Sequence, residues 1–406
     1  MARLLLLLTP SSNRVYAGNA PGVVAAELAV LAAAGVGAGV RSVEPVRVAG
    51  VNYLEVDLAV DVGSTHVGSE PGSEPGSEPG SEPGSEPGSD PGSHDLGRDP
   101  RSAATPRQPE RSEQTEPPEQ PRQPGPPLTA LGQLSAAHAL FAREGELLRP
   151  IELARSERLD DDLLTIPKYP GRTNEQFTRA LLNVTLASTS WGQRLGAHRF
   201  TVLDPLAGRG TTLSWALALG HDAYGVELER REVEAYAAFL TAWLRRKRLK
   251  HRISLDPLRR HGRHVADHLA AQLSPDADAW RAGARQHLSL WSADTLETAE
   301  LLGRRRVDAV VTDAPYGVTH ASHSGGGRGR SPGDLLAAAI PVWASVLRTG
   351  GAMGIAWNTH GLRRADLTEI CAGAGLGVRE DAPYLGLAHR VDAGIHRDVI
   401  VALKRR

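Results

Sequence analysis

The sequence is poor in cysteine and lacks long apolar runs. A single cysteine, Cys371, excludes an internal disulfide framework and favours a reducing cytoplasm. No apolar run approaches the roughly 20 residues of a membrane-spanning helix, so we expect no membrane partner. The apolar run Leu4 to Leu8 stops at Thr9-Pro10 and is too short for a secretory signal, which favours a buried strand. His320 and His323 have no cysteine cluster beside them, and we expect no metal.

A biased segment divides the chain. The four-residue repeat Ser69-Glu70-Pro71-Gly72 recurs up to Ser89-Asp90-Pro91-Gly92, and it has no apolar side chain with which to offset its ordering entropy. We therefore interpret 67–127 as a disordered linker or insertion. It carries 12 acidic and 5 basic residues, which leaves 41 basic against 35 acidic elsewhere. That excess is compatible with a polyanionic partner.

The pattern on either side of this segment suggests one small α+β domain that the insertion interrupts. Leu4 to Leu8 and Tyr53 to Val60 have the pattern of strands, while Val23 to Ala34 and the stretch around Ala136 to Glu144 are expected to be helices. We divide the chain into an N-terminal α+β part (1–66), the insertion (67–127), the remainder of that domain with a connector (128–170) and a C-terminal domain (171–406).

Apolar strand candidates alternate with helical stretches in the C-terminal half, which is typical of a parallel α/β sheet. The helices are best marked at Thr211 to Leu219 and Glu232 to Leu244. Because ligands of such sheets bind at the carboxyl ends of the strands, the residues after each strand are the candidate site. The strand candidates are Phe200 to Leu203, Ala223 to Val226, Leu288 to Trp291, Val307 to Thr312, Ala352 to Trp357 and Val399 to Leu403.

A glycine-containing turn follows the first of these strands, in Asp204-Pro205-Leu206-Ala207-Gly208-Arg209-Gly210-Thr211. Gly208 and Gly210 allow a tight turn and a close approach of ligand to backbone. Leu213 stands where a dinucleotide fold would have its third glycine. Asp204 at the start of the loop disfavours a phosphate and suits a cationic sulfonium ligand. An ordinary strand–turn–helix junction is the alternative reading.

Two more acids end successive strands. Glu227 is placed to accept hydrogen bonds from both hydroxyls of a ribose, and Asp294 to accept one from an adenine amino group. The alternatives are a solvated acid at Glu227 and a helix N-cap at Asp294. Three acids and a glycine loop at successive strand ends together predict binding of an adenosyl ligand.

The fourth strand runs into Asp313-Ala314-Pro315-Tyr316-Gly317. This sequence resembles the (Asp/Asn/Ser)-Pro-Pro-(Tyr/Phe) motif of methyltransferases that modify amino groups of nucleic-acid bases. An exocyclic amine is a poor nucleophile, because its lone pair is drawn into the ring. Two acceptors on its N–H groups, the Asp313 carboxylate and the Ala314 carbonyl, would direct that lone pair toward a methyl donor. Tyr316 would stack on the base. Ala314 replaces the first proline of the motif, while Pro315 keeps the second.

The motifs also occur in a characteristic order. Lys168-Tyr169-Pro170-Gly171-Arg172-Thr173-Asn174-Glu175-Gln176-Phe177, which has capping-box spacing from Thr173 to Gln176, precedes the glycine turn and then the Asp313 motif. This order resembles the tRNA guanosine N2-methyltransferases of archaea and eukaryotes and their actinobacterial relatives, mainly over 128–406. The resemblance implies a Rossmann-like class I methyltransferase domain, an N-terminal ferredoxin-like domain, S-adenosylmethionine as cofactor with Thr173 beside its methionine part, and tRNA as partner. A small helper subunit is left open.

Two basic stretches remain. Arg245 to Arg252 is read as a helix end that is solvated or contacts phosphate, and Ser324 to Arg330 as a disordered loop or one that closes over RNA. The sequence thus predicts a cytoplasmic, S-adenosylmethionine-dependent methyltransferase acting on guanosine N2 in tRNA. The alternatives are adenine N6 methylation of DNA and a catalytically silent RNA-binding protein of the same fold.

Overall fold

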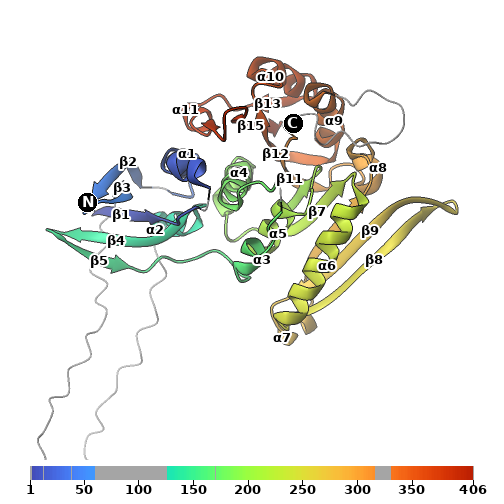
Figure 1. Cartoon of the computed structure of the whole chain (residues 1–406), viewed down its shortest axis with the longest axis horizontal. Coiled ribbons are helices and arrows are strands. Elements are labelled where there is room, and N and C mark those ends of the chain that lie inside the picture. The colour runs from blue at the N-terminus through green and yellow to red at the C-terminus, as the bar shows by residue number, and fades with distance from the viewer. Residues whose placement is uncertain are drawn as a thin grey trace, which may run out of the picture. The chain divides into compact units, whose positions relative to one another are not determined.

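A computed structural model describes residues 2–11, 13–37, 39–59, 126–169, 171–315 and 331–405 (Figure 1). These residues belong to one compact unit formed by Met1–Asp61 and Pro124–Arg406. Nearly all of the predicted insertion 67–127 lies outside the described residues, as does the glycine- and arginine-rich loop 324–330.

The N-terminal part is an antiparallel sheet in the order β2-β3-β1-β4-β5, with helices between β1 and β2 and between β3 and β4. This is the βαββαβ order of a ferredoxin-like fold with one extra edge strand, as the resemblance implies. The elements are β1 (Ala2–Leu8), α1 (Arg14–Ala33), β2 (Val40–Val48), β3 (Val51–Leu58), α2 (Pro126–Gln133), β4 (Ala137–Glu144) and β5 (Leu147–Ile151).

The expected helix around Ala136 to Glu144 is wrong, because this stretch is strand β4. Alanine-rich sequence favours a helix locally, but β4 pairs antiparallel with β1, with Leu140 opposite Leu6. Both of these leucines are buried. Pairing across the chain therefore overrides the local preference.

Helix α1 corrects the statement that no apolar run is long enough to cross a membrane. It is one described helix with the length and hydropathy of a membrane span, although only half of its apolar window is buried in the fold. Its buried side chains include Val24, Leu28 and Leu31, and also Glu27, which is fully buried. Packing within the fold accounts for much of its apolar character.

The larger sheet has ten strands among the described residues, in the order β13-β15-β12-β11-β6-β7-β10-β9-β8 with β14 beside β15. Its strands are β6 (Thr201–Asp204), β7 (Asp222–Glu227), β8 (Lys250–Arg260), β9 (Arg263–Ser274), β10 (Gln286–Ser292), β11 (Val307–Asp313), β12 (Leu347–Asn358), β13 (Leu376–Val378), β14 (His389–Arg390) and β15 (His396–Lys404). The helices of this part are α3 (Asp162–Thr165), α4 (Glu175–Ala187), η1 (Gly192–Arg194), α5 (Thr211–Ala218), α6 (Arg230–Arg246), α7 (Ala277–Arg281), η2 (Thr295–Glu297), α8 (Thr298–Leu302), α9 (Pro332–Val346), α10 (Arg364–Gly373) and α11 (Ala382–Leu385).

Strands β10, β7, β6, β11 and β12 are parallel. After β6 the chain adds β7 and β10 on one side of that strand, and it then returns to add β11 and β12 on the other side. The right-handed crossovers then place α5 and α6 on one face and α8, α9 and α10 on the other. The Rossmann-like α/β class is thus confirmed, and the switch point where such sheets bind ligands lies between β6 and β11. The sheet is mixed rather than purely parallel, because β8 and β9 and the β15 edge add antiparallel pairs.

The long hairpin of β8 and β9 was not predicted from the sequence. Strand β8 mostly alternates half-buried and exposed residues and is rich in charged and polar side chains, whereas β9, after an exposed start, largely alternates half-buried and buried residues. Helix α6 ends at Arg246, so only the first part of the basic stretch Arg245 to Arg252 is a helix end, while its last three residues begin β8.

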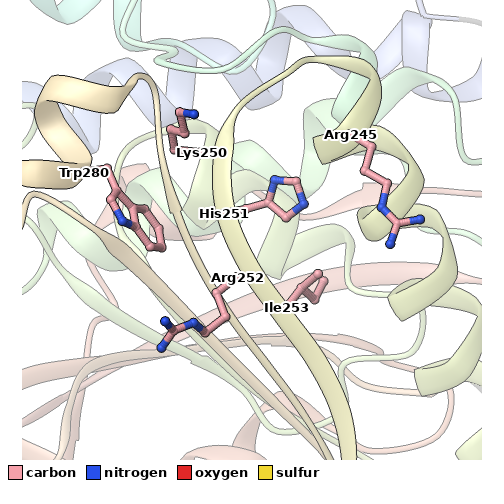
Figure 2. A pocket seen from close by; sticks show the side chains of 6 residues that line it. All are labelled: Arg245, Lys250, His251, Arg252, Ile253 and Trp280. Atoms are coloured by element: carbon pink, nitrogen blue, oxygen red, sulfur yellow. The ribbon is translucent and has the colours of Figure 1, made fainter.

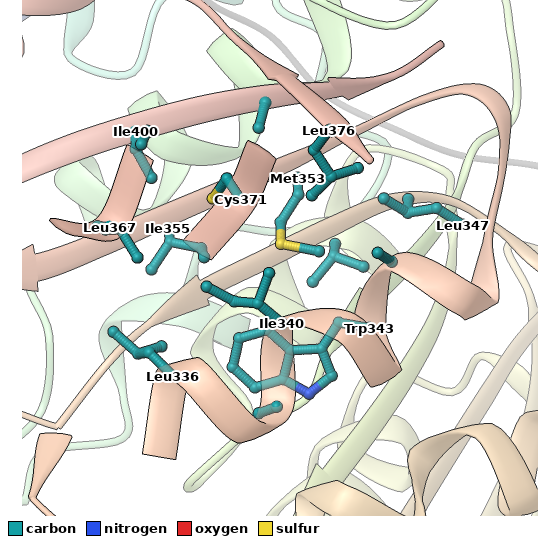
Figure 3. Packing of buried hydrophobic residues seen from close by; sticks show 14 of the residues in the cluster. Leu336, Ile340, Trp343, Leu347, Met353, Ile355, Leu367, Cys371, Leu376 and Ile400 are labelled. Carbon is teal, nitrogen blue, oxygen red and sulfur yellow. The ribbon is translucent and has the colours of Figure 1, made fainter. Parts of the chain in front are cut away.

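The main core lies between this sheet and helices α9 and α10 (Figure 3). Trp343 and Ile340 of α9 pack against Met353 and Ile355 of β12, and the lone cysteine, Cys371, is buried among them. Burial raises the pKa of the Cys371 thiol to about 12. The thiol therefore stays protonated and serves as a packing group.

A buried carboxylate joins the two sheets' helices. Glu27 of α1 accepts hydrogen bonds from the backbone N–H of Ser135 at 3.0 Å, from its hydroxyl at 2.5 Å, and from Asn183 of α4 at 2.7 Å. Burial raises the pKa of Glu27, and the same donors oppose that shift. A buried acceptor with this many donors is expensive to remove, because each donor then loses its partner.

We predict that Glu27→Ala lowers the free energy of unfolding by about 3 kcal/mol, since buried donors are left unpaired. Urea denaturation of the purified protein measures this change. Glu44→Ala, at an exposed position of β2, is the matched control and should stay within about 0.5 kcal/mol of the parent. Equal stability of the two variants would contradict the role given to Glu27.

Candidate active site

The switch point brings together the ends of β6 and β11. Asp204, the last residue of β6, is 4% exposed and accepts hydrogen bonds from the Thr312 hydroxyl at 2.8 Å and from the Leu206 N–H at 3.1 Å. Burial raises its pKa to about 6. Because Thr312 directly precedes Asp313, this bond connects the glycine turn to the predicted amine-binding motif.

The turn after β6 contains the two predicted glycines, and they have different roles. Gly210 has a φ of +72°, and a Cβ there would lie 2.8 Å from the Tyr236 ring, so packing requires glycine. Gly208 has a φ of +50° and no atom within 4 Å of a Cβ position, so its outer side is open. An open backbone beside strand ends is what a closely bound ligand requires.

The second predicted acid supports this turn. Glu227, the last residue of β7, is half-buried and accepts the N–H of Gly208 at 2.7 Å and of Glu229 at 2.9 Å. Burial raises its pKa. A carboxylate has about four acceptor positions, so two backbone bonds leave capacity for ligand hydroxyls.

Asp294 follows β10 and caps the short helix η2, where its side chain accepts the Leu296 N–H at 2.9 Å. The helix-cap alternative is therefore realised in the structure. Asp204 and Glu227 end β6 and β7, and Asp294 lies two residues after the end of β10, so the three acids follow three strands that are neighbours in the sheet. Their ability to hold a cofactor stays a prediction.

Asp313 is anchored from two sides. The Thr173 hydroxyl donates to its Oδ2 at 2.6 Å, and Nη2 of Arg397 lies 3.2 Å from the same oxygen. The Arg397 side chain is 4% exposed and that of Asp313 is 15% exposed. Two charge-assisted bonds to one oxygen fix the direction of the carboxylate.

Thr173 does not cap helix α4 as its capping-box spacing suggested. Asn174 is the N-cap and accepts the Phe177 N–H at 3.0 Å, which frees the Thr173 hydroxyl to reach Asp313. Helix α4 therefore begins one residue later than predicted, and the Thr173 side chain belongs to the candidate site.

The rest of the motif is only partly described. Ala314 is 2% exposed and donates its N–H to the Ala356 carbonyl at 2.8 Å, which holds the end of β11 against β12. Pro315 and Ala314 line a small cavity together with Trp357 and Asn358. Tyr316 and Gly317 lie outside the described residues, so the stacking role of Tyr316 stays a prediction.

Sequence reasoning missed Arg397, which comes from β15, 84 positions after Asp313. Its guanidinium lies 4.3 Å from the centre of the Phe177 ring, and Phe177 in turn contacts the His389 ring at 5.0 Å. No local motif marks an arginine in a late strand, so only the β12–β15 pairing reveals it. Leu228, which directly follows Glu227, is 55% exposed.

No family model matches the chain, and no curated protein matches it. Among solved structures it is similar to a TehB-like SAM-dependent methyltransferase from Corynebacterium glutamicum (14% identity, 52% of this chain and 83% of that one, TM-score 0.30). It is also similar to TrmN from Thermus thermophilus (17%, 63% and 56%, TM-score 0.35). A third is the 1,6-didemethyltoxoflavin-N1-methyltransferase of Burkholderia thailandensis, crystallised with S-adenosylhomocysteine (20%, 57% and 80%, TM-score 0.30).

The raised pKa of Asp204 gives a prediction about stability. A carboxyl whose pKa is about 6 when folded and about 4 when unfolded stabilises the fold below about pH 4 and loses this contribution as the pH rises through about 6. We therefore expect Asp204→Asn, which keeps an acceptor for Thr312, to gain stability relative to the parent between pH 4 and 7. The gain should be about 3 kcal/mol.

Urea denaturation of the parent and of Asp204→Asn at a series of pH values measures this difference. An exposed acid, Asp256→Asn, serves as control for the change from a carboxyl to an amide. A difference between the parent and Asp204→Asn that does not vary with pH would contradict this prediction.

Proposed function

We propose that this protein is a methyltransferase that uses S-adenosylmethionine to methylate an exocyclic amino group of a nucleic-acid base, namely N2 of a guanosine in tRNA. One observation carries the proposal: Asp313, in the sequence Asp-Ala-Pro-Tyr, is anchored at the switch point of a doubly wound sheet by Thr173 and Arg397. That is the place where such sheets bind ligands.

The strand ends beside Asp313 fit the cofactor. Glu227 would accept the ribose hydroxyls, and the open side of Gly208 would allow the adenosyl group to approach the backbone. The exposed Leu228 offers an apolar surface to a purine ring. Gly210 allows the turn to pack closely against Tyr236, and Asp204 holds the turn by accepting the Leu206 N–H. Asp294 remains a candidate to accept a hydrogen bond from the adenine amino group. When bound, the cofactor supplies an electrophilic methyl group.

The amine would be held by residues of the β11 end. Asp313 would accept one N–H of the amino group and the Ala314 carbonyl the other, which directs the nitrogen lone pair outward. Arg397 places a positive charge 3.2 Å from one oxygen of Asp313 and so helps to hold this acceptor in place. Tyr316 would stack on the base and keep its plane fixed. Thr173, which lies just before α4, would position Asp313 through its hydroxyl hydrogen bond. This role would come in addition to the cofactor contact that the family resemblance implies.

The choice of tRNA rests on the order of motifs upstream and on the ferredoxin-like N-terminal sheet. We retain the division into an N-terminal domain (1–66 and 128–170) that the insertion 67–127 interrupts, followed by a catalytic domain from 171 to 406. The N-terminal domain would contact RNA away from the methylated base. We place the protein in the cytoplasm, where tRNA is modified, and leave a helper subunit open.

The substrate is tested by incubating the purified protein with labelled cofactor and either tRNA or duplex DNA, followed by digestion and identification of the methylated nucleoside. We expect N2-methylguanosine from tRNA. Label in DNA alone, as N6-methyladenine, would contradict the tRNA assignment. Label in neither substrate would favour a silent RNA-binding protein.

The role of Asp313 gives a second prediction. Asp313→Asn should lower kcat by about 100-fold, because one amine acceptor becomes an amide that no longer carries charge. Thr173→Val, which keeps the shape but loses the donor, should lower kcat by about tenfold and leave the KM for the cofactor within about twofold. Steady-state methylation assays measure both. A rise in KM for the cofactor with kcat unchanged would show that Thr173 serves the cofactor instead.

A further inference from the structure

The hairpin of β8 and β9 forms an arm at the edge of the large sheet. Strand β8 is antiparallel to β9, and β9 is antiparallel to β10, so β8 runs in the same direction as β6 and β11. The tip of the hairpin therefore lies at the carboxyl edge, the edge that holds the candidate active site. Figure 1 shows β8 and β9 as a long ribbon at the end of the sheet.

The tip extends past its neighbour. The last pairing of β10 joins Trp291 to His268, which lies opposite Asp256 on β8. Four more residues of β8 follow up to Arg260, so the arm projects about 13 Å beyond that pairing. It closes in a two-residue turn at His261-Gly262, where both φ angles are positive (+49° and +79°). Such a turn fixes the register of a hairpin.

Packing against the sheet holds the arm in place. Ala266 is buried with Trp291 and Ala293, and Leu258 packs against the same cluster. Asp267 anchors the base of the projecting part, since its N–H donates to the Ser292 hydroxyl at 3.0 Å and its carboxylate pairs with Arg230 at 2.9 Å. The tip is thus presented on a supported ribbon.

The tip concentrates positive charge. Arg259, Arg260 and Arg263 are all exposed. Arg260 and Arg263 face each other directly across the hairpin, a like-charge pair that destabilises a sheet. One Arg260 nitrogen donates to the Glu300 carbonyl at 2.7 Å, a neutral partner that leaves its charge in place. A bound polyanion would relieve this repulsion.

We propose that the tip of the β8–β9 arm binds the phosphodiester backbone of the RNA substrate; this inference rests on the proposed RNA methylation. Strand β8 is five strand spacings from β11, about 24 Å, so the tip would contact phosphates several nucleotides away from the methylated base. Arginines at a hairpin tip bind phosphates through charge and carry no sequence information there. The contact therefore positions the RNA and strengthens its binding.

A second basic group at the opposite end of the arm provides an internal control. Arg245, Lys250 and Arg252 surround a pocket beside Trp280, as Figure 2 shows. This pocket lies where β8 begins, at the amino edge of the parallel strands and away from the candidate active site. The two basic groups have similar charge, but one lies at the same edge of the sheet as Asp313 and the other at the opposite edge. Comparing them shows whether RNA binding depends on where the charge lies or only on its amount.

The test compares two double variants of the full chain, Arg259→Gln with Arg263→Gln at the tip and Arg245→Gln with Arg252→Gln at the base. Fluorescence anisotropy with a labelled, unmodified tRNA transcript measures affinity between about 0.05 and 0.2 M salt, the range in which phosphate contacts show their salt dependence. We expect the tip variant to bind about tenfold more weakly, with a salt slope smaller by about 1 to 2. The base variant should match the parent. Circular dichroism checks that all three proteins are folded.

Unchanged affinity and slope in the tip variant would overturn the proposal, and so would an equal loss in the base variant. If the parent protein itself binds no tRNA, then the proposed function is wrong, and so is the proposal that the arm binds RNA. This last result is distinct from the others, because it is read from the parent alone.

Discussion

The carboxylate of Asp313 connects three separate segments of the chain. One oxygen receives the Thr173 hydroxyl from the start of α4 and the Arg397 guanidinium from β15, while Asp313 itself ends β11. A side chain held in this way has lost its freedom before any substrate arrives, so the direction of its acceptor oxygens is set by the fold. Because β15 pairs with β12, and β12 with β11, the late antiparallel strand is needed to bring Arg397 to the site.

The cofactor side of the proposed site depends on a related constraint. Asp204 is buried and bonded to Thr312, so the strand that ends in the glycine turn and the strand that ends in Asp313 are coupled by one hydrogen bond. Glu227 then supports the turn through Gly208. Asp204 and Glu227 therefore hold the glycine turn in its conformation, whether or not they also contact a ligand. This explains why the sequence alone allowed both a structural and a functional interpretation of each acid.

Much of the large sheet could be predicted, because apolar strands separated by amphipathic helices leave a strong periodic signal, and the acids and glycines fall at the strand ends. The misses have two causes. Strand β4 has a helix-favouring composition and Arg397 is remote in sequence, and both are placed by pairing between distant segments, which local propensity does not encode. The β8–β9 hairpin is a local pairing, but its first strand is rich in charged and polar residues and lacks an apolar strand pattern. Thr173 was singled out, but its bond to Asp313 depends on α4 beginning at Glu175.

The central claim is that the cofactor and the amine occupy different residues at the same edge of the sheet. Titration calorimetry with S-adenosylhomocysteine tests it most directly, because this product binds without any nucleic acid. The account predicts that Glu227→Gln weakens binding by about tenfold or more, whereas Asp313→Asn changes it by less than about threefold. Loss of binding in Asp313→Asn with Glu227→Gln unaffected, or no binding by the parent protein, would contradict it.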